Sequence, residues 1–405
     1  MRVFNIPASA PFLRTLAIAL VDGDLVPGFS ARHDPGRLAD ATLYLPTRRA
    51  GRMAREVFLD VLARDAAILP RIVTLGDIDE DEGAFAESDL RDSFEIAPAL
   101  DDLTRRLTLS RLVAAWTRQL RPESPLEAPL IAGGPAATLA LATDLARLMD
   151  DMATRGVDWA ALDGLVPDAL DRYWQLSLDF LRIAREAWPA HLAGLGCIEA
   201  ATRRDLLIAA EAARLARHAS GPVVAAGSTG SMPATAKFLE AIARLPNGAV
   251  VLPGLDTDLD DAAWDSIGGT RAGDSRAGAP SSNHPQFALH GLLARFGIAR
   301  ADVKALGAPA APGRELLASE AMRPSAATGE WHRRLAQPDV ARRIAGAMQG
   351  LTVIAAPNPE MEALAIAVAM REARAHKLSA ALVTPDRALA RRVMAALEAK
   401  LGVGR

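Results

Sequence analysis

Four arginines near the start of the chain have a spacing that suits contacts with a phosphate backbone. Arg48, Arg52 and Arg55 are separated by four and three residues, which places them on one face of a helix, and Arg49 lies beside them. Guanidinium groups and helix N-termini bind nucleic-acid phosphates without reading the base sequence. The row equally fits a solvated helix face with acidic residues on the following turns, and the sequence leaves both interpretations open.

A second candidate for anion binding is the loop GSTGS at residues 227–231, which follows the apolar run VVAA and precedes a helical pattern. Its backbone amides and the hydroxyls of Ser228, Thr229 and Ser231 are suited to a DNA phosphate or to the phosphate of a small molecule. No Gly-Lys pair follows, and VVAA ends without the acidic residues that hold magnesium beside ATP. A structural turn is therefore the favoured interpretation.

The first loop of the chain stands where a nucleotide-binding α/β protein carries GxxxxGK[ST]. In that motif the glycines let backbone N–H groups approach phosphate, and the lysine adds positive charge. Here Ala8 and Leu13 occupy the glycine positions, Ser9 follows Ala8, and Arg14 and Thr15 stand where Lys-Thr would be. Because side chains would crowd the space that phosphates need, the sequence predicts a degenerate loop without ATP binding.

Neither the acidic residues nor the histidines form a recognised metal-binding pattern. One acidic cluster follows an apolar run and consists of Asp256, Asp258, Asp260 and Asp261. Asp261 stands where a calcium loop requires glycine, so we expect these carboxylates to cap the next helix. His284 and His290 have no common metal-ligand spacing, and we interpret them as unrelated loop residues. We therefore predict no metal site and no resident cofactor in this chain.

The elements that must position these residues alternate between strand and helix. Apolar runs predict strands over 2–6, 41–45, 223–226 and 249–252. Helical patterns follow at 13–20, 48–63 and 234–245. A further βαβ-like unit is expected near the end, with strands over 351–356 and 380–383 and helices over 360–376 and 388–401. This order predicts an α/β fold around a parallel sheet. Between the two halves, apolar residues recur at spacings of three and four, which predicts a helical block.

Composition narrows the class of protein. The chain has 405 residues, of which 46 are basic and 49 acidic, for a formal net charge of -3. This balance excludes a globally cationic nucleic-acid binder but allows a local basic row. The single cysteine, Cys197, excludes internal disulfides and a cysteine-bound cluster built from this chain, and indicates a cytoplasmic setting. The longest uncharged stretch, residues 128–143, is too short to cross a bilayer, so no membrane association is expected.

Several long segments together resemble the AddB family, the second subunits of the bacterial AddAB helicase-nucleases that process double-strand breaks, in its alphaproteobacterial form. The resembling segments are VFNIPASAPFL, ATLYLPTRRAGRMAREVFLD, LPRIVTLGD, VVAAGSTGSMPATAKFLEAIARLPNGAVVLPGLDTDLDD, HPQFALHGLLARFGIAR, LTVIAAPNPEMEALAIAVAMREA and AALVTPDRALARRV. They run through nearly the whole chain. GSTGSMPAT and LPNGAVVLPGLD are the most specific, because they are long and have no generic catalytic explanation.

The resemblance implies a superfamily 1 helicase-like architecture. A helicase-like α/β domain with a degenerate nucleotide loop would cover 1–95 and 219–340, a helical insertion 96–218, and the start of a second helicase-like α/β domain 350–405. The subunit would hold DNA while the motor of an AddA-type helicase-nuclease partner, its companion in a heterodimer, uses ATP. The family continues into a C-terminal nuclease, and none of that follows Arg405, so we expect a truncated chain without nuclease activity; whether it is an enzyme stays open.

Two other classes of protein remain as alternatives. The chain would be a self-contained α/β enzyme if the GSTGS loop bound a phosphorylated small molecule in a pocket near residues 228–231. It would be a protein-interaction module if it had no affinity for DNA.

Overall fold

The computed structural model describes residues 1–75, 96–120, 134–162, 172–269 and 279–401, with only the backbone described at 172–175 and 400–401. These residues fall into two compact units, Met1–Ile344 and Ala345–Arg405. No helix in the described ranges is long and apolar enough to cross a membrane.

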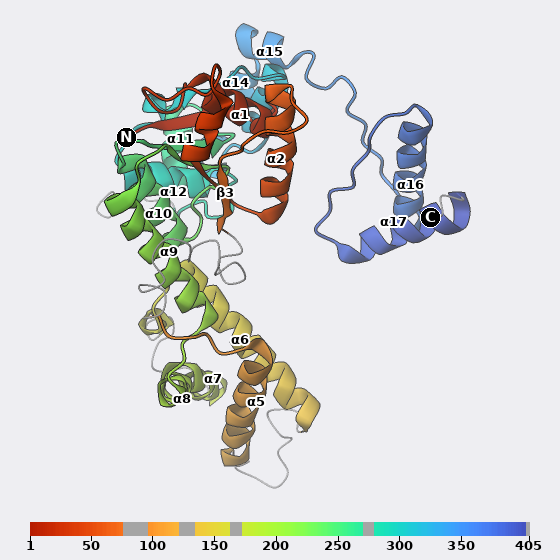
Figure 1. Cartoon of the computed structure of the whole chain (residues 1–405). Coiled ribbons are helices and arrows are strands. Elements are labelled where there is room, and N and C mark those ends of the chain that lie inside the picture. Colours follow the sequence, from red (N-terminus) through yellow and green to blue (C-terminus); the bar gives the residue numbers. More distant parts are fainter. Residues whose placement is uncertain (76–95, 121–133, 163–171, 270–278, 402–405) are drawn as a thin grey trace. The chain divides into compact units, whose positions relative to one another are not determined.

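The first unit is built around a sheet of six strands that all run parallel, in the order β3-β2-β4-β5-β1-β6. Figure 1 labels β3 and helices of this unit. The strands are β1 (Val3–Ile6), β2 (Thr42–Leu45), β3 (Arg71–Thr74), β4 (Val223–Ala226), β5 (Gly248–Pro253) and β6 (Lys304–Ala305). The predicted α/β class with a parallel sheet is therefore confirmed. All residues of β1 and β4 are buried, as expected for central strands covered on both faces.

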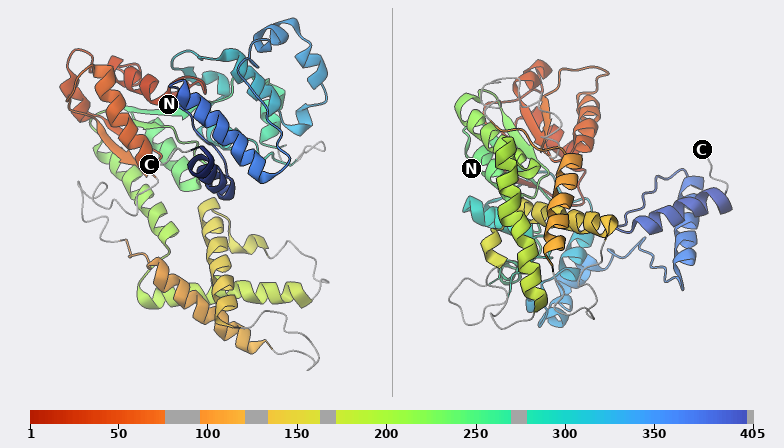
Figure 2. Two further views of the ribbon diagram at one scale, coloured as in Figure 1. Left: turned by 90° about the vertical axis from the view of Figure 1, so that its right-hand side faces the viewer. Right: turned by 90° about the horizontal axis from the view of Figure 1, so that it is seen from below.

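Helices cover both faces of this sheet (Figure 2). One face packs against α1 (Phe12–Asp22) and α2 (Arg48–Leu62). The other face packs against α9 (Ala200–His218), α10 (Pro233–Arg244), α11 (Asp261–Ile267) and α12 (Phe287–Phe296). Successive strand residues supply the two cores alternately: Val223 and Ala225 of β4 face α10, whereas Val224 and Ala226 face α1 and α2.

The strand order creates a switch point between β1 and β5. These strands are direct neighbours, with Val3 paired to Val250 and Ile6 to Pro253. The chain leaves β1 toward α1 on one face of the sheet, and it leaves β5 toward α11 and α12 on the other face. Loops that diverge in this way leave a crevice at the carboxyl ends of the strands, which is where ligands bind in open α/β sheets.

A helical segment between β3 and β4 has a core of its own. Its helices are α5 (Asp102–Gln119), α6 (Pro135–Arg155), α7 (Arg172–Arg182) and α8 (Trp188–Leu195), with a π-helical turn at Ile183–Ala187. They pack around Leu109, Leu145 and Trp188, without a residue of the sheet in the cluster. An isolated parallel bridge joins Ala99, where the chain enters this segment, to Ile198, where it leaves.

Three further helices complete the first unit, namely α13 (Pro312–Ala321), α14 (Trp331–Leu335) and α15 (Pro338–Ile344). Ion pairs with buried members connect α13 and α14 to each other and to the loop after β5. Glu320, whose side chain is 1% exposed, pairs with Arg323 and with Arg334, and Arg323 also reaches Asp260 at 2.7 Å.

The second unit consists of α16 (Pro359–Ala375) packed on α17 (Arg387–Leu401). Both helices were predicted, but the strands expected over 351–356 and 380–383 are absent: these described residues have no regular structure. Val353 is 86% exposed and Val383 is 93% exposed. A strand requires a neighbour for its backbone groups, and these segments have none among the described residues, so their apolar sequence alone does not produce a sheet.

Candidate functional site

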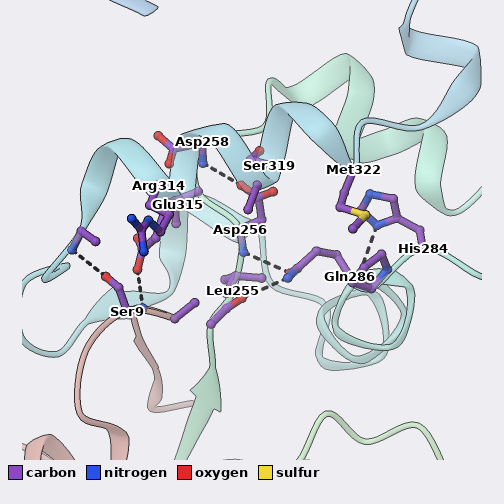
Figure 3. A pocket seen from close by; sticks show the side chains of 16 residues that line it. Ser9, Leu255, Asp256, Asp258, His284, Gln286, Arg314, Glu315, Ser319 and Met322 are labelled. Atoms are coloured by element: carbon purple, nitrogen blue, oxygen red, sulfur yellow. Dashed lines mark hydrogen bonds between the residues drawn. The ribbon is translucent and has the colours of Figure 1, made fainter. Parts of the chain in front are cut away.

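A cavity of about 420 Å³ opens at the switch point between β1 and β5 (Figure 3). Its walls come from the loop after β1, the loop after β5, residues 284–286 before α12, and the helix α13. The polar residues that line it are Ser9, Asp256, Thr257, Asp258, His284, Gln286, Arg314, Glu315 and Ser319. These residues are distant in sequence, and the strand order brings them to one edge of the sheet.

The degenerate nucleotide loop forms part of this cavity. One of its backbone N–H groups is already hydrogen-bonded to a carboxylate of the same chain. The N–H of Ser9 donates to Oε1 of Glu315 at 2.6 Å, and Oγ of Ser9 accepts from the N–H of Ala311 at 3.0 Å. Ala8 lies against Gly254, where an added Cβ would approach that of Ala8 to 3.1 Å. The loop after β1 is therefore fastened to α13 rather than open for a phosphate.

The other two residues of the predicted loop point elsewhere. Arg14 is exposed on α1. The methyl group of Thr15 packs against Gly307, where a Cβ added to the glycine would lie 3.1 Å from that methyl group. Neither residue lines the cavity. Of the four residues predicted as a degenerate nucleotide loop, the structure thus brings only Ala8 and Ser9 to the site.

Gln286 shapes the side of the cavity formed by β5. Its Nε2 donates to the carbonyl of Gly254, and its Oε1 accepts from the N–H of Asp256, both at 3.0 Å. The N–H of Gln286 donates in turn to Nδ1 of His284 at 3.1 Å. Since Nδ1 is the acceptor, neutral His284 carries its proton on Nε2.

Two residues that line the cavity each have a side-chain polar atom without a hydrogen-bond partner in the described chain. These atoms are Nε2 of His284 and Oγ of Ser319, and both are buried. Ser319 as a whole is 7% exposed. Buried polar groups in folded proteins nearly always find partners, so two unpartnered atoms within the wall of one cavity are unusual.

The acidic cluster caps helix α11 and forms ion pairs. Asp260 is the N-cap of α11 and accepts from the N–H of Ala263 at 3.0 Å, which confirms the predicted capping. Asp258 pairs with Arg343 at 2.6 Å, and Asp261 pairs with Arg300 at 2.7 Å. Although desolvation opposes it, the Ala263 N–H and the Arg323 guanidinium hold the pKa of Asp260 below its usual range. Among the described residues, no cluster of His, Cys, Asp and Glu could hold a metal ion.

The arginine row lies on α2, whose first residue, Arg48, follows the N-cap Thr47. The side chains of Arg48, Arg49, Arg52 and Arg55 all belong to exposed residues. The helix instead buries Gly51, Ala54 and Phe58 against the sheet. In the part of the chain that the structure describes, Arg49, Arg52 and Arg55 form no ion pair, either with the nearby acidic residues of α2 or with others.

The GSTGS loop is a compact turn at the end of β4. Oγ of Ser228 accepts from the N–H of Gly230 at 3.3 Å, and Gly230 has a φ of 65°. A Cβ at Gly230 would lie 2.8 Å from Cδ1 of Leu292, and the left-handed backbone would strain any other residue, so glycine is favoured there. Thr229 is half-buried and Ser231 is exposed, and neither lines the cavity.

The loop after β4 and the start of α2 are brought together by the sheet. Strands β2 and β4 are neighbours, so the GSTGS loop and Arg48 follow adjacent carboxyl ends. Gly227 lies close to Pro46: a Cβ added to the glycine would be 3.5 Å from Cδ of the proline. The predicted basic row and the predicted anion loop therefore share one edge of the sheet.

No pattern in the sequence pointed to Glu315, to Ser319 or to the role of His284. Glu315 and Ser319 lie outside every motif discussed above, and His284 only begins the segment HPQFALHGLLARFGIAR. Their common location depends on how α13 and residues 284–286 close over the sheet. No protein-family model and no curated protein matches this chain.

Proposed function

We propose that this chain is the DNA-holding, helicase-like part of a double-strand break repair helicase-nuclease subunit, which acts in DNA end processing in the cytoplasm beside an AddA-type partner. The observation that carries the proposal is the hydrogen bond from the Ser9 N–H to Glu315. A helicase-like sheet whose nucleotide loop is filled by its own carboxylate has the form expected of a subunit that leaves ATP hydrolysis to another chain.

Electrostatics supports this interpretation. A phosphate that approached the Ser9 N–H would have to displace the Glu315 carboxylate, and the Asp256 carboxylate belongs to a residue that lines the same cavity. Like charges within a few ångströms repel strongly where water is partly excluded. The site at the end of β1 is therefore unfavourable for nucleotide phosphates.

The arginine row supports contact with DNA. Arg49, Arg52 and Arg55 are exposed on one helix, and none of them has a carboxylate partner among the described residues. A helix N-terminus and unpaired guanidinium groups suit phosphates, and they impose no base sequence. The alternative, an enzyme acting at the GSTGS loop, relies on a turn in which Ser228 already accepts from Gly230.

Salt-dependent binding of oligonucleotides tests the proposal. We expect the full chain to bind a fluorescein-labelled single strand or a duplex end weakly, with no dependence on base sequence and with affinity that falls as salt rises. The triple variant Arg49→Ala, Arg52→Ala, Arg55→Ala should lower the slope of log affinity against log salt by about one unit per lost phosphate contact.

A matched variant controls for net charge. Arg111, Arg155 and Arg295 are also exposed, lie on α5, α6 and α12, and form no ion pair in the described structure. Replacing these three by alanine should leave the slope unchanged. Equal slopes for the α2 variant and the wild-type protein would contradict the assignment of the row, and the absence of any binding would overturn the function.

A further inference from the structure

We propose that Glu56 and Asp60 end the phosphate-binding surface of α2, so that a nucleic-acid strand crosses this helix over its first two turns and does not follow the helix axis. The inference rests on the proposed DNA binding, and it adds the path of the strand and the two residues that determine this path. Both acidic residues are exposed, and neither forms an ion pair with a residue that the structure describes.

The exposed charges of α2 are divided by sign along the helix. All of its basic residues lie within the segment 48–55, and both of its acidic residues follow, at Glu56 and Asp60. Arg48 already has an interaction within the protein, whereas the other three arginines form no ion pair in the described chain. At about 1.5 Å of rise per residue, the basic surface covers only about 10 Å of the helix axis.

The spacing places the acidic residues on the same side of α2 as the middle of the row. Arg52, Glu56 and Asp60 follow one another at intervals of four residues, so they share one face of the helix. A strand that followed the axis from Arg52 would pass over two carboxylates, and these repel phosphate. A strand that crosses the helix avoids both carboxylates and still meets the guanidinium groups of the first two turns.

This order of charges does not stabilise the helix that carries it. Acidic residues in the first turn and basic residues in the last turn stabilise a helix, and α2 has neither. Like charges at spacings of three and four are unfavourable, and α2 has such pairs in Arg49 and Arg52, in Arg52 and Arg55, and in Glu56 and Asp60. Departures of this kind from local rules are typical of functional surfaces.

Neutralising the two carboxylates tests where the surface ends. The double variant Glu56→Gln, Asp60→Asn of the full chain should bind a fluorescein-labelled oligonucleotide about threefold more tightly than the wild-type protein at low salt. The gain should disappear at high salt, because screening weakens the repulsion. Tm should stay equal or rise, since the change removes a like-charge pair and a negative charge from the last turn.

A matched variant controls for net charge. Asp151 of α6 and Glu398 of α17 are also exposed and form no ion pair among the described residues. The variant Asp151→Asn, Glu398→Gln removes the same number of charges and should bind like the wild-type protein. The reverse change, Glu56→Arg with Asp60→Arg, continues the row along the helix and should raise the salt slope by up to about two units, one for each added phosphate contact.

The outcomes separate this inference from the proposed function. Equal binding by the wild-type protein and the neutralised variant would show that the carboxylates do not face the strand, and so would an unchanged slope after Glu56→Arg with Asp60→Arg. A lower Tm for the neutralised variant would show that Glu56 and Asp60 stabilise α2. Each of these results overturns the inference and leaves DNA binding in place, whereas a wild-type protein that binds no oligonucleotide overturns both.

Polyglutamate distinguishes a nucleic acid from an acidic protein as the occupant of this surface. We expect it to bind the wild-type protein more weakly than the oligonucleotide does, because a guanidinium fork suits the closely spaced phosphates of a strand. Equally tight binding of polyglutamate, with the same gain in the neutralised variant, would assign the surface to an acidic protein and overturn the inference.

Discussion

Glu315 shows how a single side chain can replace a ligand. Its carboxylate accepts the N–H that the loop after β1 would otherwise offer to a phosphate. We predict that the protein neither binds nor hydrolyses Mg-ATP at millimolar nucleotide, because the amide is occupied and Leu13 and Arg14 stand where Gly-Lys is needed. Calorimetry and a phosphate-release assay would measure this. ATP turnover that is stimulated by single-stranded DNA and lost on changing Arg14 would refute it.

His290 gives a pH dependence with a defined sign. It lies 5.2 Å from the ring of Trp264, and burial lowers its pKa below the usual 6.5, against the weaker opposing effect of Asp265. Below about pH 6.5 the unfolded chain therefore binds a proton that the folded chain does not, so the free energy of unfolding falls as the solution is acidified.

The measurement is Tm at pH 7.5 and at pH 5.5, for the wild-type protein and for His290→Gln. We expect acidification to lower Tm more in the wild-type protein, because the variant has no imidazole to protonate at that site. If the two proteins lose the same number of degrees, His290 does not contribute to the pH dependence.

At the scale of elements, the buried carboxylate of Glu320 holds α13 and α14 to the loop after β5. It pairs with Arg323 and Arg334, and the Arg323 side chain is 4% exposed. Replacing Glu320 by alanine leaves a buried guanidinium with only Asp260, so we predict a loss of about 3–5 kcal/mol in the free energy of unfolding. Urea denaturation would measure it.

An exposed ion pair on the neighbouring helix provides the comparison. Glu330 pairs with Arg333, and both side chains are about three-quarters exposed (74% and 75%). Glu330→Ala should cost only about 0–1 kcal/mol, since exposed pairs contribute little. Similar losses for the two variants would mean that burial does not strengthen the Glu320 pairs.

The central strands of the sheet could be predicted from the sequence, whereas the edge strands β3 and β6 could not. β1, β2, β4 and β5 have apolar runs because both of their faces are covered. β3 reads RIVT and buries only Val73, and β6 consists of two exposed residues that are defined by pairing with Phe4 and Asn5. Such strands depend on a neighbour more than on their own sequence.

The same distinction applies to the candidate site. The spacing of Arg48, Arg52 and Arg55 is local, so the exposed helix face could be read from the sequence. Glu315 and Ser319 reach the cavity only because α13 packs over the carboxyl ends of β1 and β5. Tertiary proximity of this kind has no signature in a single sequence.

At the scale of the whole molecule, the two units should differ in local stability. Among the described residues, the core of the second unit has three buried side chains, Ala363, Ala367 and Val393. Segments 351–356 and 380–383 have no strand partner there, and Leu382 is the residue of these segments that packs against the core. We predict that amides in those two segments exchange with deuterium within seconds, whereas β4 stays protected, because opening it requires disrupting the sheet. Mass spectrometry of the full chain would compare them, and slow exchange in either segment would contradict the prediction.

The bridge between Ala99 and Ile198 has a consequence for how the protein tolerates change. It holds the entry and the exit of the helical segment one strand spacing apart, about 5 Å. From the side of the sheet, the whole segment therefore behaves like a tight turn, whatever its length. Insertions or deletions in the parts of the segment remote from α9 and α10 would leave the closure of the chain around the sheet unaltered, whereas the end of α6 is constrained where Gly156 lies against Pro233.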